Sequence, residues 1–458
     1  LLDTPGHKDF SEDTYRTLMA ADAAVMVIDG AKGVEAQTRK LFKVCTLRHI
    51  PIFTFVNKLD RDARDPFDLM EEIETVLGIG TYPMNWPIGS GRGFRGVFDR
   101  AARRVLAFEG DGHANATKRV DEVEAELGDP ALDELIGEEN HRNLGDDIEL
   151  LDGADNEFDL EAVHTGKLTP VFFGSALTNF GVGPFLRDFL RLAPAPLAYM
   201  DRLTGEKVDP SRNDFSGFVF KIQANMDKNH RDRIAFVRVA SGKYTPGMKM
   251  KVQRSAKELR PTSVVTFMSQ RREAVQEAYA GDIIGFTTHG GVQLGDTITD
   301  GANLQFTGLP FFAPEMFMTV VLKNPLRAKQ LQQGLAQLGE EGAIQVFKPD
   351  AGGNMLLGAI GQLQFEVAQH RLKTEYDCDV RLEGCQYTGA RWITADDPAD
   401  LRAFTDAYPM RMAHDAADTL AYLCTSPYDV RLAQERFPKI QFHPLREHAG
   451  LALQGSPS

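Results

Sequence analysis

Residues 23–29 read AAVMVID, and residues 51–60 read PIFTFVNKLD. Each stretch is a short apolar run, rich in β-branched and aromatic residues, and this composition is typical of a buried strand. Residues 35–49, which lie between them, have the pattern of a helix. A strand, a helix and a second strand in this order predict a βαβ unit with parallel strands. In such sheets ligands bind at the carboxyl ends of the strands, where Asp29 and residues 57–60 fall.

The segment Asn57-Lys58-Leu59-Asp60 indicates a guanine-binding loop. A carboxylate at Asp60 can accept hydrogen bonds from both N1–H and the exocyclic amine of guanine, and adenine lacks this pair of donors. Asn57 can bond to the other edge of the base, and the stem of Lys58 can lie along the ring face. The same four residues could also form a polar turn after a strand. Their position at the end of a predicted parallel strand favours the nucleotide site.

The segment Asp3-Thr4-Pro5-Gly6-His7 fits the phosphate end of the same nucleotide. Asp3 can hold Mg²⁺, because this hard cation prefers oxygen ligands and keeps some of its water. Gly6 lets the backbone approach a terminal phosphate closely. His7 would then position the attacking water for phosphoryl transfer, which makes it the candidate catalytic residue. The alternative is a plain strand-to-helix turn before a helix that begins near Ser11.

A third segment, Gly174-Ser175-Ala176-Leu177, follows the predicted strand 170–173. The backbone N–H of Ala176 is well placed to meet guanine O6, although many strands end in a similar turn that only caps the next helix. The candidate nucleotide-binding residues are Asp3, Thr4, Pro5, Gly6, His7, Asn57, Lys58, Leu59, Asp60, Ser175, Ala176 and Leu177, and Asp3 is the candidate magnesium ligand.

The usual cradle for the α- and β-phosphates is missing from the sequence. It contains no Gly-x-x-x-x-Gly-Lys-Ser/Thr loop, and it begins at Leu1, inside what we predict to be a strand. We therefore expect an amino-terminally truncated P-loop-type domain. The longer parent would bind and hydrolyse the nucleotide, whereas this fragment would do so poorly.

The three motifs, in this order, resemble those of the translational GTPases. The resemblance narrows to bacterial class-II peptide chain release factors in LLDTPGHKDFSEDTYRTL (1–18), FVFKIQANMDKNHRDRIAFVRVASGKY (218–244) and LAQERFPKIQFHPLREH (432–448). That family implies a ribosome-stimulated GTP hydrolase of the cytoplasm that uses GTP/GDP and Mg²⁺ and removes class-I release factors from the ribosome. The implied partners are ribosomal RNA and proteins and the class-I factors, with no membrane and no DNA, and the implied state is a monomer.

Three domains are predicted from the length of the chain and from the Pro-rich and Gly-rich segments that interrupt it. A GTP-binding α/β domain spans 1–200 and carries an acidic insertion at about 95–168, and the Pro-rich linker at 192–197 ends it. Short β-rich runs separated by glycines predict an antiparallel β-barrel over 201–307. Mixed strands and helices over 308–458 predict an α+β, ferredoxin-like domain.

The net charge of −14 is unevenly distributed along the chain. Residues 121–161 contain seventeen Asp and Glu against Arg142 alone, whereas residues 228–272 contain twelve Lys and Arg against two acidic residues. A basic surface of this density suits the phosphate backbone of RNA, although it could be only a solvated barrel surface. The acidic segment could be a solvated helical surface or a docking face for a basic ribosomal protein.

Three functions remain open from the sequence: a release-factor GTPase, a translocating factor resembling elongation factor G, and a ribosome-binding module without catalysis. The elongation-factor family has further domains after the ferredoxin-like one, which favours the first. The four cysteines have neither disulfide-scaffold density nor a Cys-x-x-Cys pair. They indicate idle thiols in a reducing compartment, with zinc ligation by Cys378 and Cys385 as the weaker alternative.

Overall fold

The computed structural model describes residues 1–4, 11–47, 49–108, 122–154, 157–224, 233–261, 264–268, 271–288, 291–306 and 309–447. The chain divides into two compact units. The nucleotide unit comprises Ala21–Ala195, and the carboxyl-terminal unit comprises Pro196–Ser458 together with Leu1–Ala20. Residues 1–20, which carry the predicted phosphate-binding segment, therefore belong to a different unit from the predicted base-binding loops.

The nucleotide unit is built on a parallel sheet whose described strands have the order β1-β2-β8-β3. The strands are β1 (Ala24–Asp29), β2 (Ile52–Asn57), β3 (Gly80–Pro83) and β8 (Leu168–Phe173). Helix α2 (Ala36–Leu47) connects β1 to β2, which confirms the predicted βαβ unit. All the strands run in one direction, so their carboxyl ends meet at one edge of the sheet.

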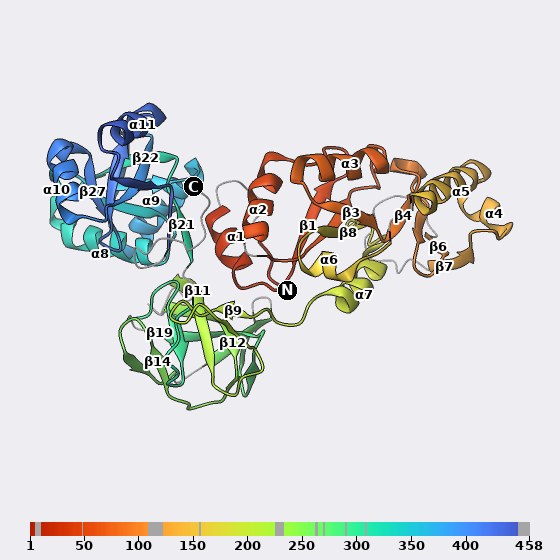
Figure 1. The fold of residues 1–458 in the computed structure, drawn as a ribbon, viewed down its shortest axis with the longest axis horizontal. Coiled ribbons are helices and arrows are strands. Elements are labelled where there is room, and N and C mark those ends of the chain that lie inside the picture. Colours follow the sequence, from red (N-terminus) through yellow and green to blue (C-terminus); the bar gives the residue numbers. More distant parts are fainter. Residues whose placement is uncertain are drawn as a thin grey trace. The chain divides into compact units, whose positions relative to one another are not determined.

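Helices cover both faces of this sheet. In Figure 1, α3 (Pro66–Leu77) lies on one side, and α6 (Leu160–His164) and α7 (Val182–Leu192) lie on the other. On the α3 side, Ile28 of β1 packs with Ile73 of α3. On the α7 side, aromatic rings of β2 and β8 pack against α7. This second layer consists chiefly of Phe53, Phe55, Phe172, Phe185 and Phe189.

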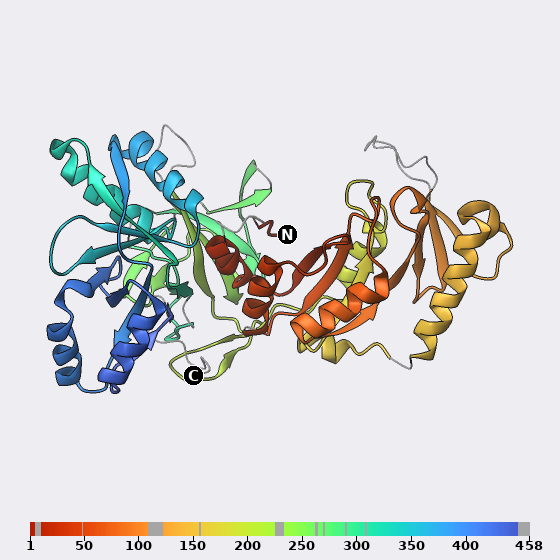
Figure 2. The same ribbon diagram turned by 90° about the horizontal axis from the view of Figure 1, so that it is seen from above.

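An inserted subdomain lies between β3 and β8. It contains an antiparallel sheet and two helices, which lie at one end of the nucleotide unit (Figure 2). The elements are β4 (Asn85–Ile88), β5 (Gly96–Asp99), β6 (Arg104–Phe108), β7 (Glu122–Glu126), α4 (Ala131–Ile136) and α5 (Glu138–Gly153). Trp86 and Phe98 are fully buried in its core, and the Trp86 Nε1–H donates to Asp147 of α5 at 2.9 Å. Despite its acidic sequence, the insertion is thus a packed structure, and its core is continuous with buried residues of the parallel sheet such as Val56 and Phe173.

The first half of the carboxyl-terminal unit is barrel-like. Its main sheet is antiparallel, with the order β15-β14-β20-β11-β12-β19-β16-β17 among the described strands. The strands are β11 (Ser216–Ala224), β12 (Arg233–Ser241), β14 (Met250–Val252), β15 (Lys257–Leu259), β16 (Val264–Met268), β17 (Arg271–Ala274), β19 (Ile283–Thr288) and β20 (Thr297–Thr299); the short pairs are β9 (Tyr199–Met200) with β10 (Lys207–Val208) and β13 (Lys243–Tyr244) with β18 (Ala278–Tyr279).

The second half of this unit contains the same β-α-β-β-α-β order twice. The first copy has the strand order β25-β22-β24-β23 and the second has β29-β26-β28-β27, which is the ferredoxin-like arrangement in each case. The first copy is β22 (Met316–Leu322), α8 (Ala328–Glu340), β23 (Gln345–Pro349), β24 (Leu356–Ala359), α9 (Gln362–Tyr376) and β25 (Val380–Gly384). The second is β26 (Gly389–Thr394), α10 (Pro398–Ala407), β27 (Met412–Asp415), β28 (Leu420–Cys424), α11 (Pro427–Arg436) and β29 (Gln441–His443). Strands β23 and β27 pair, so the copies share one sheet.

Helix α1 (Ser11–Leu18) is seated on the carboxyl-terminal unit. Its neighbours are β21 (Pro310–Phe312), which pairs with β30 (Leu445–Glu447), and the barrel strand β11. Met19 and Ala20, just after the helix, belong to the same buried core as the barrel strands. Within the described residues, the search for membrane spans found no helix with the length and apolar character that crossing a bilayer requires.

Candidate functional site

Two of the three predicted segments meet at the carboxyl edge of the parallel sheet. Asn57 ends β2 and leads into Lys58-Leu59-Asp60, and residues 174–177 follow β8, the neighbouring strand. The two loops are tied together through the backbone, because Leu59 N–H donates to the Gly174 carbonyl at 3.2 Å. The structure therefore brings residues 57–60 and 174–177 side by side, and their role as one site stays a prediction.

Asn57 joins the two loops with its side chain. Its Oδ1 accepts hydrogen bonds from the backbone N–H of Ala176 at 2.9 Å and from that of Lys58 at 2.8 Å. The Ala176 N–H, which we expected to meet a base oxygen, therefore has a protein acceptor in this structure. Asn57 thus holds the loop at 174–177 beside the loop at 57–60.

Asp60 is oriented by the other loop. Ser175, which is fully buried, donates its hydroxyl hydrogen to Asp60 Oδ1 at 2.5 Å. The side chain of Asp60 is 16% exposed, and its Oδ2 lies 4.0 Å from the Arg61 guanidinium. A carboxylate held by a buried hydroxyl on one oxygen keeps a fixed direction, and its remaining acceptor positions can receive donors from a ligand. The sequence analysis gave Ser175 no such role.

Lys58 is held in an unusual position. Its backbone has a φ of +71°, in the left-handed region that non-glycine residues rarely adopt. Its Nζ forms an ion pair with Asp29 Oδ2 at 2.7 Å, across the edge from β2 to β1. Lys58 is the main reason that the pKa of Asp29 lies below its usual value. Asp29 is thus a supporting residue, and its position at the end of β1 was the only signal for it in the sequence.

The remaining residues of the two loops differ in exposure. Leu59 is 2% exposed and packs in the hydrophobic core, so its side chain holds the loop at 57–60 against the interior of the unit. Leu177 is 54% exposed at the rim. At Gly174 an added Cβ would collide with the Phe180 carbonyl, so only glycine allows the two sides of this turn to approach so closely. The loops are therefore a compact turn structure around Asp60.

The predicted phosphate-binding segment is described only in part. Asp3 is exposed and Thr4 is half-buried, and both belong to the carboxyl-terminal unit. Pro5, Gly6 and His7 lie outside the described residues. The proposed roles of these five residues therefore stay predictions.

Helix α1, which follows this segment, makes specific contacts with the carboxyl-terminal unit. Arg16 is 5% exposed and donates from Nη1 to the Gly342 carbonyl at 3.0 Å. The same guanidinium lies over the Phe311 ring, 5.5 Å from its centre. The Tyr15 ring packs against Phe312 at a centroid distance of 4.8 Å. These contacts hold α1 against the rest of the carboxyl-terminal unit through one charged and one aromatic side chain.

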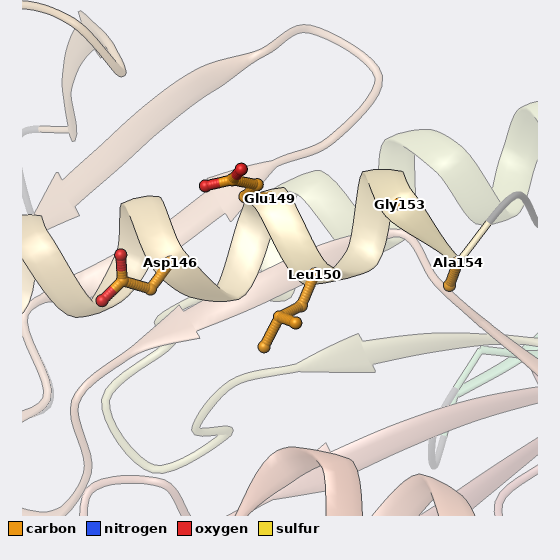
Figure 3. Close-up of a pocket in the computed structure, with 5 residues that line it drawn as sticks. All are labelled: Asp146, Glu149, Leu150, Gly153 and Ala154. Carbon is orange, nitrogen blue, oxygen red and sulfur yellow. The ribbon is translucent and has the colours of Figure 1, made fainter.

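A surface depression of the nucleotide unit lies away from the base-binding loops. It is lined by residues of α5 and the residue that follows it, namely Asp146, Glu149, Leu150, Gly153 and Ala154 (Figure 3). Leu150 is 64% exposed. The lining of this depression includes no residue of the loops at 57–60 or 174–177.

Neither metals nor thiols add a second centre in the described part of the chain. No group of three or more His, Cys, Asp or Glu side chains converges there in a way that could hold a metal ion. Cys378 is buried with its thiol near the Arg327 carbonyl, and burial raises its pKa. The described residues therefore offer no set of ligands that would support the zinc alternative for Cys378 and Cys385.

Comparisons with known proteins agree with this arrangement. Three family models match: "Elongation factor Tu GTP binding domain" over residues 1–195, "Elongation factor G domain 2" over 214–301, and "Class II release factor RF3, C-terminal domain" over 306–434. The chain is similar to Peptide chain release factor 3 of Bordetella pertussis, at 54% identity over 98% of this chain and 83% of the relative. It is 53% identical to the protein of the same name from Nitrosomonas eutropha, over 99% of this chain and 84% of that protein.

The fold also occurs among solved structures. An example is the crystal structure of ttk003000868 from Thermus thermophilus, with a TM-score of 0.64 and 24% sequence identity. The match covers 87% of this chain and 60% of that one. At this identity the likeness supports the arrangement of elements only.

Proposed function

The chain belongs to the peptide chain release factor 3 family, and from that premise we propose which of its residues do the family's work. The function is that of a translation-termination GTPase, which recycles class-I release factors from the ribosome. This agrees with the first of the three functions that the sequence left open. The relatives bear the name of a release factor, which sets aside the interpretation as a translocating factor.

We propose that the loops at 57–60 and 174–177 select guanine. The observation that carries this is the hydrogen bond from Ser175 to Asp60, because it fixes the carboxylate that would accept from the N1–H and the amine of the base. Asn57 holds the second loop in register, and the Lys58 stem, anchored at its tip by Asp29, is available to lie against a ring face. We therefore assign base recognition to Asn57, Lys58, Asp60, Ser175 and Ala176.

The test is a change of base preference. Replacing Asp60 by Asn removes the carboxylate and adds an amide donor, which suits the carbonyl that xanthine carries in place of the guanine amine. We expect Asp60→Asn to weaken binding of guanosine diphosphate at least tenfold and to strengthen binding of xanthosine diphosphate, both measured by calorimetric titration. Matched titration with Asp62→Asn, an exposed neighbour, controls for charge. An unchanged preference in Asp60→Asn would remove Asp60 from base recognition.

We propose that the phosphate end is served by residues 3–7. Asp3 and Thr4 offer a carboxylate and a hydroxyl, which are the oxygen donors that Mg²⁺ prefers, and Asp3 is exposed. Bound there, the ion would neutralise charge on the phosphates. Gly6 would approach the terminal phosphate with its N–H, and His7 would position water for the attack. Because the sequence has no Gly-x-x-x-x-Gly-Lys-Ser/Thr loop, we propose that the chain by itself hydrolyses GTP poorly.

We propose that α1 carries the nucleotide state to the carboxyl-terminal unit. The helix begins at Ser11, four residues beyond His7, and its Arg16 and Tyr15 bind the carboxyl-terminal unit. A ligand shifts a conformational equilibrium only through its different affinity for the two states. Contacts of the γ-phosphate with residues 6–7 would hold the start of α1 in one position, and loss of this phosphate would release it.

We propose that the barrel provides the RNA-binding surface through Lys249, Lys251, Lys257 and Arg260 on and beside β14 and β15. Other members of the basic segment have protein partners. Among them, Arg254 is paired with Asp296 at 2.7 Å, Lys243 with Glu277, and Arg233 with Glu340. Arg233, one of the twelve basic residues of 228–272, is 13% exposed and bridges the barrel to α8, so we leave it out of this surface. Arg231, in the same segment, lies outside the described residues.

We propose three functional domains, 1–200 with its insertion, 201–307 and 308–458, and a monomer that acts on the ribosome.

A further inference from the structure

The turn at residues 29–34, which follows β1, holds the tip of Lys58. Its first residue, Asp29, uses one carboxylate oxygen for the turn and the other for the lysine: Oδ1 accepts the backbone N–H of Ala31 at 3.0 Å, and Oδ2 pairs with Lys58 Nζ at 2.7 Å. The Asp29 carbonyl accepts the N–H of Gly33 at 2.9 Å, which closes the turn. The direction of the Asp29 carboxylate, and with it the place of the Lys58 amine, therefore depends on how this turn is held.

Glu72 of α3 and Arg64 hold this turn near both of its ends. One oxygen of the Glu72 carboxylate, Oε1, accepts the backbone N–H of Val34 at 3.2 Å, and the other, Oε2, forms an ion pair with the Arg64 guanidinium. The backbone N–H of Arg64 donates to the Gly30 carbonyl at 3.0 Å. The side chain of Glu72 is 22% exposed and Val34 is 6% exposed, so water reaches these groups only in part, and the contacts are stronger than they would be at a free surface.

Gly33 leaves the space in which this ion pair fits. Its φ is +73°, and a Cβ at this position would collide with the Glu72 carboxylate and with the Arg64 guanidinium. A residue with a side chain here would therefore displace the pair as well as strain the turn. The close packing at Gly33 thus joins the position of the pair to the conformation of the turn.

We propose that Glu72 and Arg64 are positioning residues of the guanine site. Through residues 29–34 they hold the Asp29 carboxylate in the direction that keeps the Lys58 stem against the ring of the base. The inference rests on the proposed contact of Lys58 with guanine. A side chain that is already held in its binding position loses less conformational entropy when the ligand binds. Loss of the pair should therefore weaken the binding of any nucleotide whose base lies against Lys58, without changing the choice between bases.

The first measurement follows Lys58 without any nucleotide. Its amine is acetylated with a trace of acetic anhydride, and the rate at this lysine is determined by mass spectrometry. An amine held in an ion pair reacts slowly, because only its neutral form is a nucleophile. We expect Glu72→Ala to raise the rate at Lys58 about threefold, as loss of one partly exposed ion pair would. The matched control is Glu74→Ala, which removes a carboxylate from the same helix that accepts the Thr81 N–H of β3 at 2.9 Å, and it should leave the rate unchanged.

Nucleotide affinity is the second measurement. Guanosine and inosine diphosphates are titrated calorimetrically, since inosine lacks the exocyclic amine that Asp60 would bind. We expect Glu72→Ala to weaken the binding of both nucleotides to the same extent, about fivefold each, whereas Asp60→Asn should change the ratio between them. Glu72→Gln keeps an acceptor for the Val34 N–H but loses the ion pair, so its affinities should lie between those of the natural chain and Glu72→Ala.

Gly33→Ala tests the same coupling from the side of the turn. It should raise the acetylation rate at Lys58 as Glu72→Ala does, whereas Gly166→Ala should not, because that glycine has the same φ of +73° but nothing within 4 Å of its Cβ position. If the rate is unchanged in Glu72→Ala and in Gly33→Ala, the proposal is wrong. A faster rate with unchanged affinities would overturn the guanine contact of Lys58 and not its support by Glu72, so the two failures can be told apart.

Discussion

At the scale of single residues, the site depends on side chains that hold other side chains. Ser175 orients Asp60, Asn57 fastens the second loop, and Asp29 holds the tip of Lys58. Each of these contacts restricts the freedom of a side chain or loop that we propose to contact guanine, which lowers the conformational-entropy cost of binding.

Removal of the Ser175 hydroxyl should therefore weaken nucleotide binding without touching the base directly. A hydrogen bond to a charged group contributes about 1.5–3 kcal/mol, so we expect Ser175→Ala to lower the affinity for guanosine diphosphate at least tenfold and to reduce the preference over adenosine diphosphate. Titration with both nucleotides measures this. Ser211→Ala, which removes a hydroxyl bonded to Asp209 in the other unit, is the control, and equal affinities of the two variants would contradict the role of Ser175.

The Asp29–Lys58 pair should give the protein a small acid sensitivity. The pKa of Asp29 is lowered in the folded state, chiefly by Lys58, so its contribution to stability is present above the unfolded value near 3.9 and is lost as the pH falls through the lower, folded value. For such an exposed pair the contribution stays below about 1 kcal/mol.

Urea unfolding at pH 6 and pH 3 gives the free energy of unfolding at each pH. We expect the natural chain to lose more of it on acidification than Asp29→Asn does. Equal losses would mean that the pair is not formed in solution.

At the scale of secondary-structure elements, helix α1 is the most informative feature. It is short, and helices of eight residues have little stability of their own in water. Its order therefore comes from Tyr15, Arg16 and the buried residues after it, all of which bind the carboxyl-terminal unit. A helix that depends on such contacts is well suited to be moved by a change at its start.

A substitution at Gly342 tests this dependence. Gly342 has a φ of +68°, and a Cβ there would lie 2.5 Å from the Arg16 guanidinium. We expect Gly342→Ala to displace Arg16 and to raise the rate of amide hydrogen exchange in α1 at least tenfold. Gly352→Ala is a matched control, because this glycine also has a positive φ, of +81°, but nothing lies within 4 Å of its Cβ position. The same increase in both variants would show that backbone strain alone is responsible.

Some strands and helices could be predicted from the sequence, and others could not. The strands at β1, β2 and β8 were predictable because apolar runs of six residues with polar ends leave few alternatives. A ferredoxin-like domain was predicted over 308–458, whereas its duplication into a second β-α-β-β-α-β copy was not. Its strands β27 and β28 carry Met, Ala, His, Asp and Tyr in place of β-branched runs, and their pairing is set by tertiary contacts.

Those candidate site residues could be predicted whose signal lies in the sequence directly around them. Asn57, Asp60 and Ser175 could be identified because each lies directly after an apolar strand. The ion pair of Lys58 with Asp29, the hydrogen bond of Ser175 to Asp60 and the pairing of Arg233 with Glu340 join residues at least 29 positions apart. No pattern within a window of sequence contains such partners, so they required coordinates.

At the scale of the whole molecule, charge is distributed by unit and by surface. Most acidic residues of 121–161 that the structure describes belong to the inserted subdomain, whereas Lys249, Lys251 and Lys257, on and beside β14 and β15, belong to the barrel. A net charge of −14 is therefore compatible with an RNA-binding surface, because attraction to phosphate depends on the local density of charge.

Removal of Lys249, Lys251 and Lys257 should lower ribosome affinity most at low salt. Each phosphate contact contributes about 0.7–0.9 to the slope of log affinity against log salt concentration, so the triple alanine variant should show a slope smaller by about 2–3. Filter binding over a series of salt concentrations measures it. A triple variant of the exposed Lys207, Lys329 and Lys373 carries the same loss of charge elsewhere. If both variants have the same slope, the effect is one of net charge and not of a binding surface.

The pairing of β23 with β27 has a mechanical consequence for the carboxyl-terminal half. Backbone hydrogen bonds cross the junction between the two copies from Phe347 to Pro349, so the copies have no flexible joint between them. We expect the two copies to move together as one rigid body. A displacement at Gly342, in the connection between α8 and β23, would then be passed on to the second copy and its helices α10 and α11.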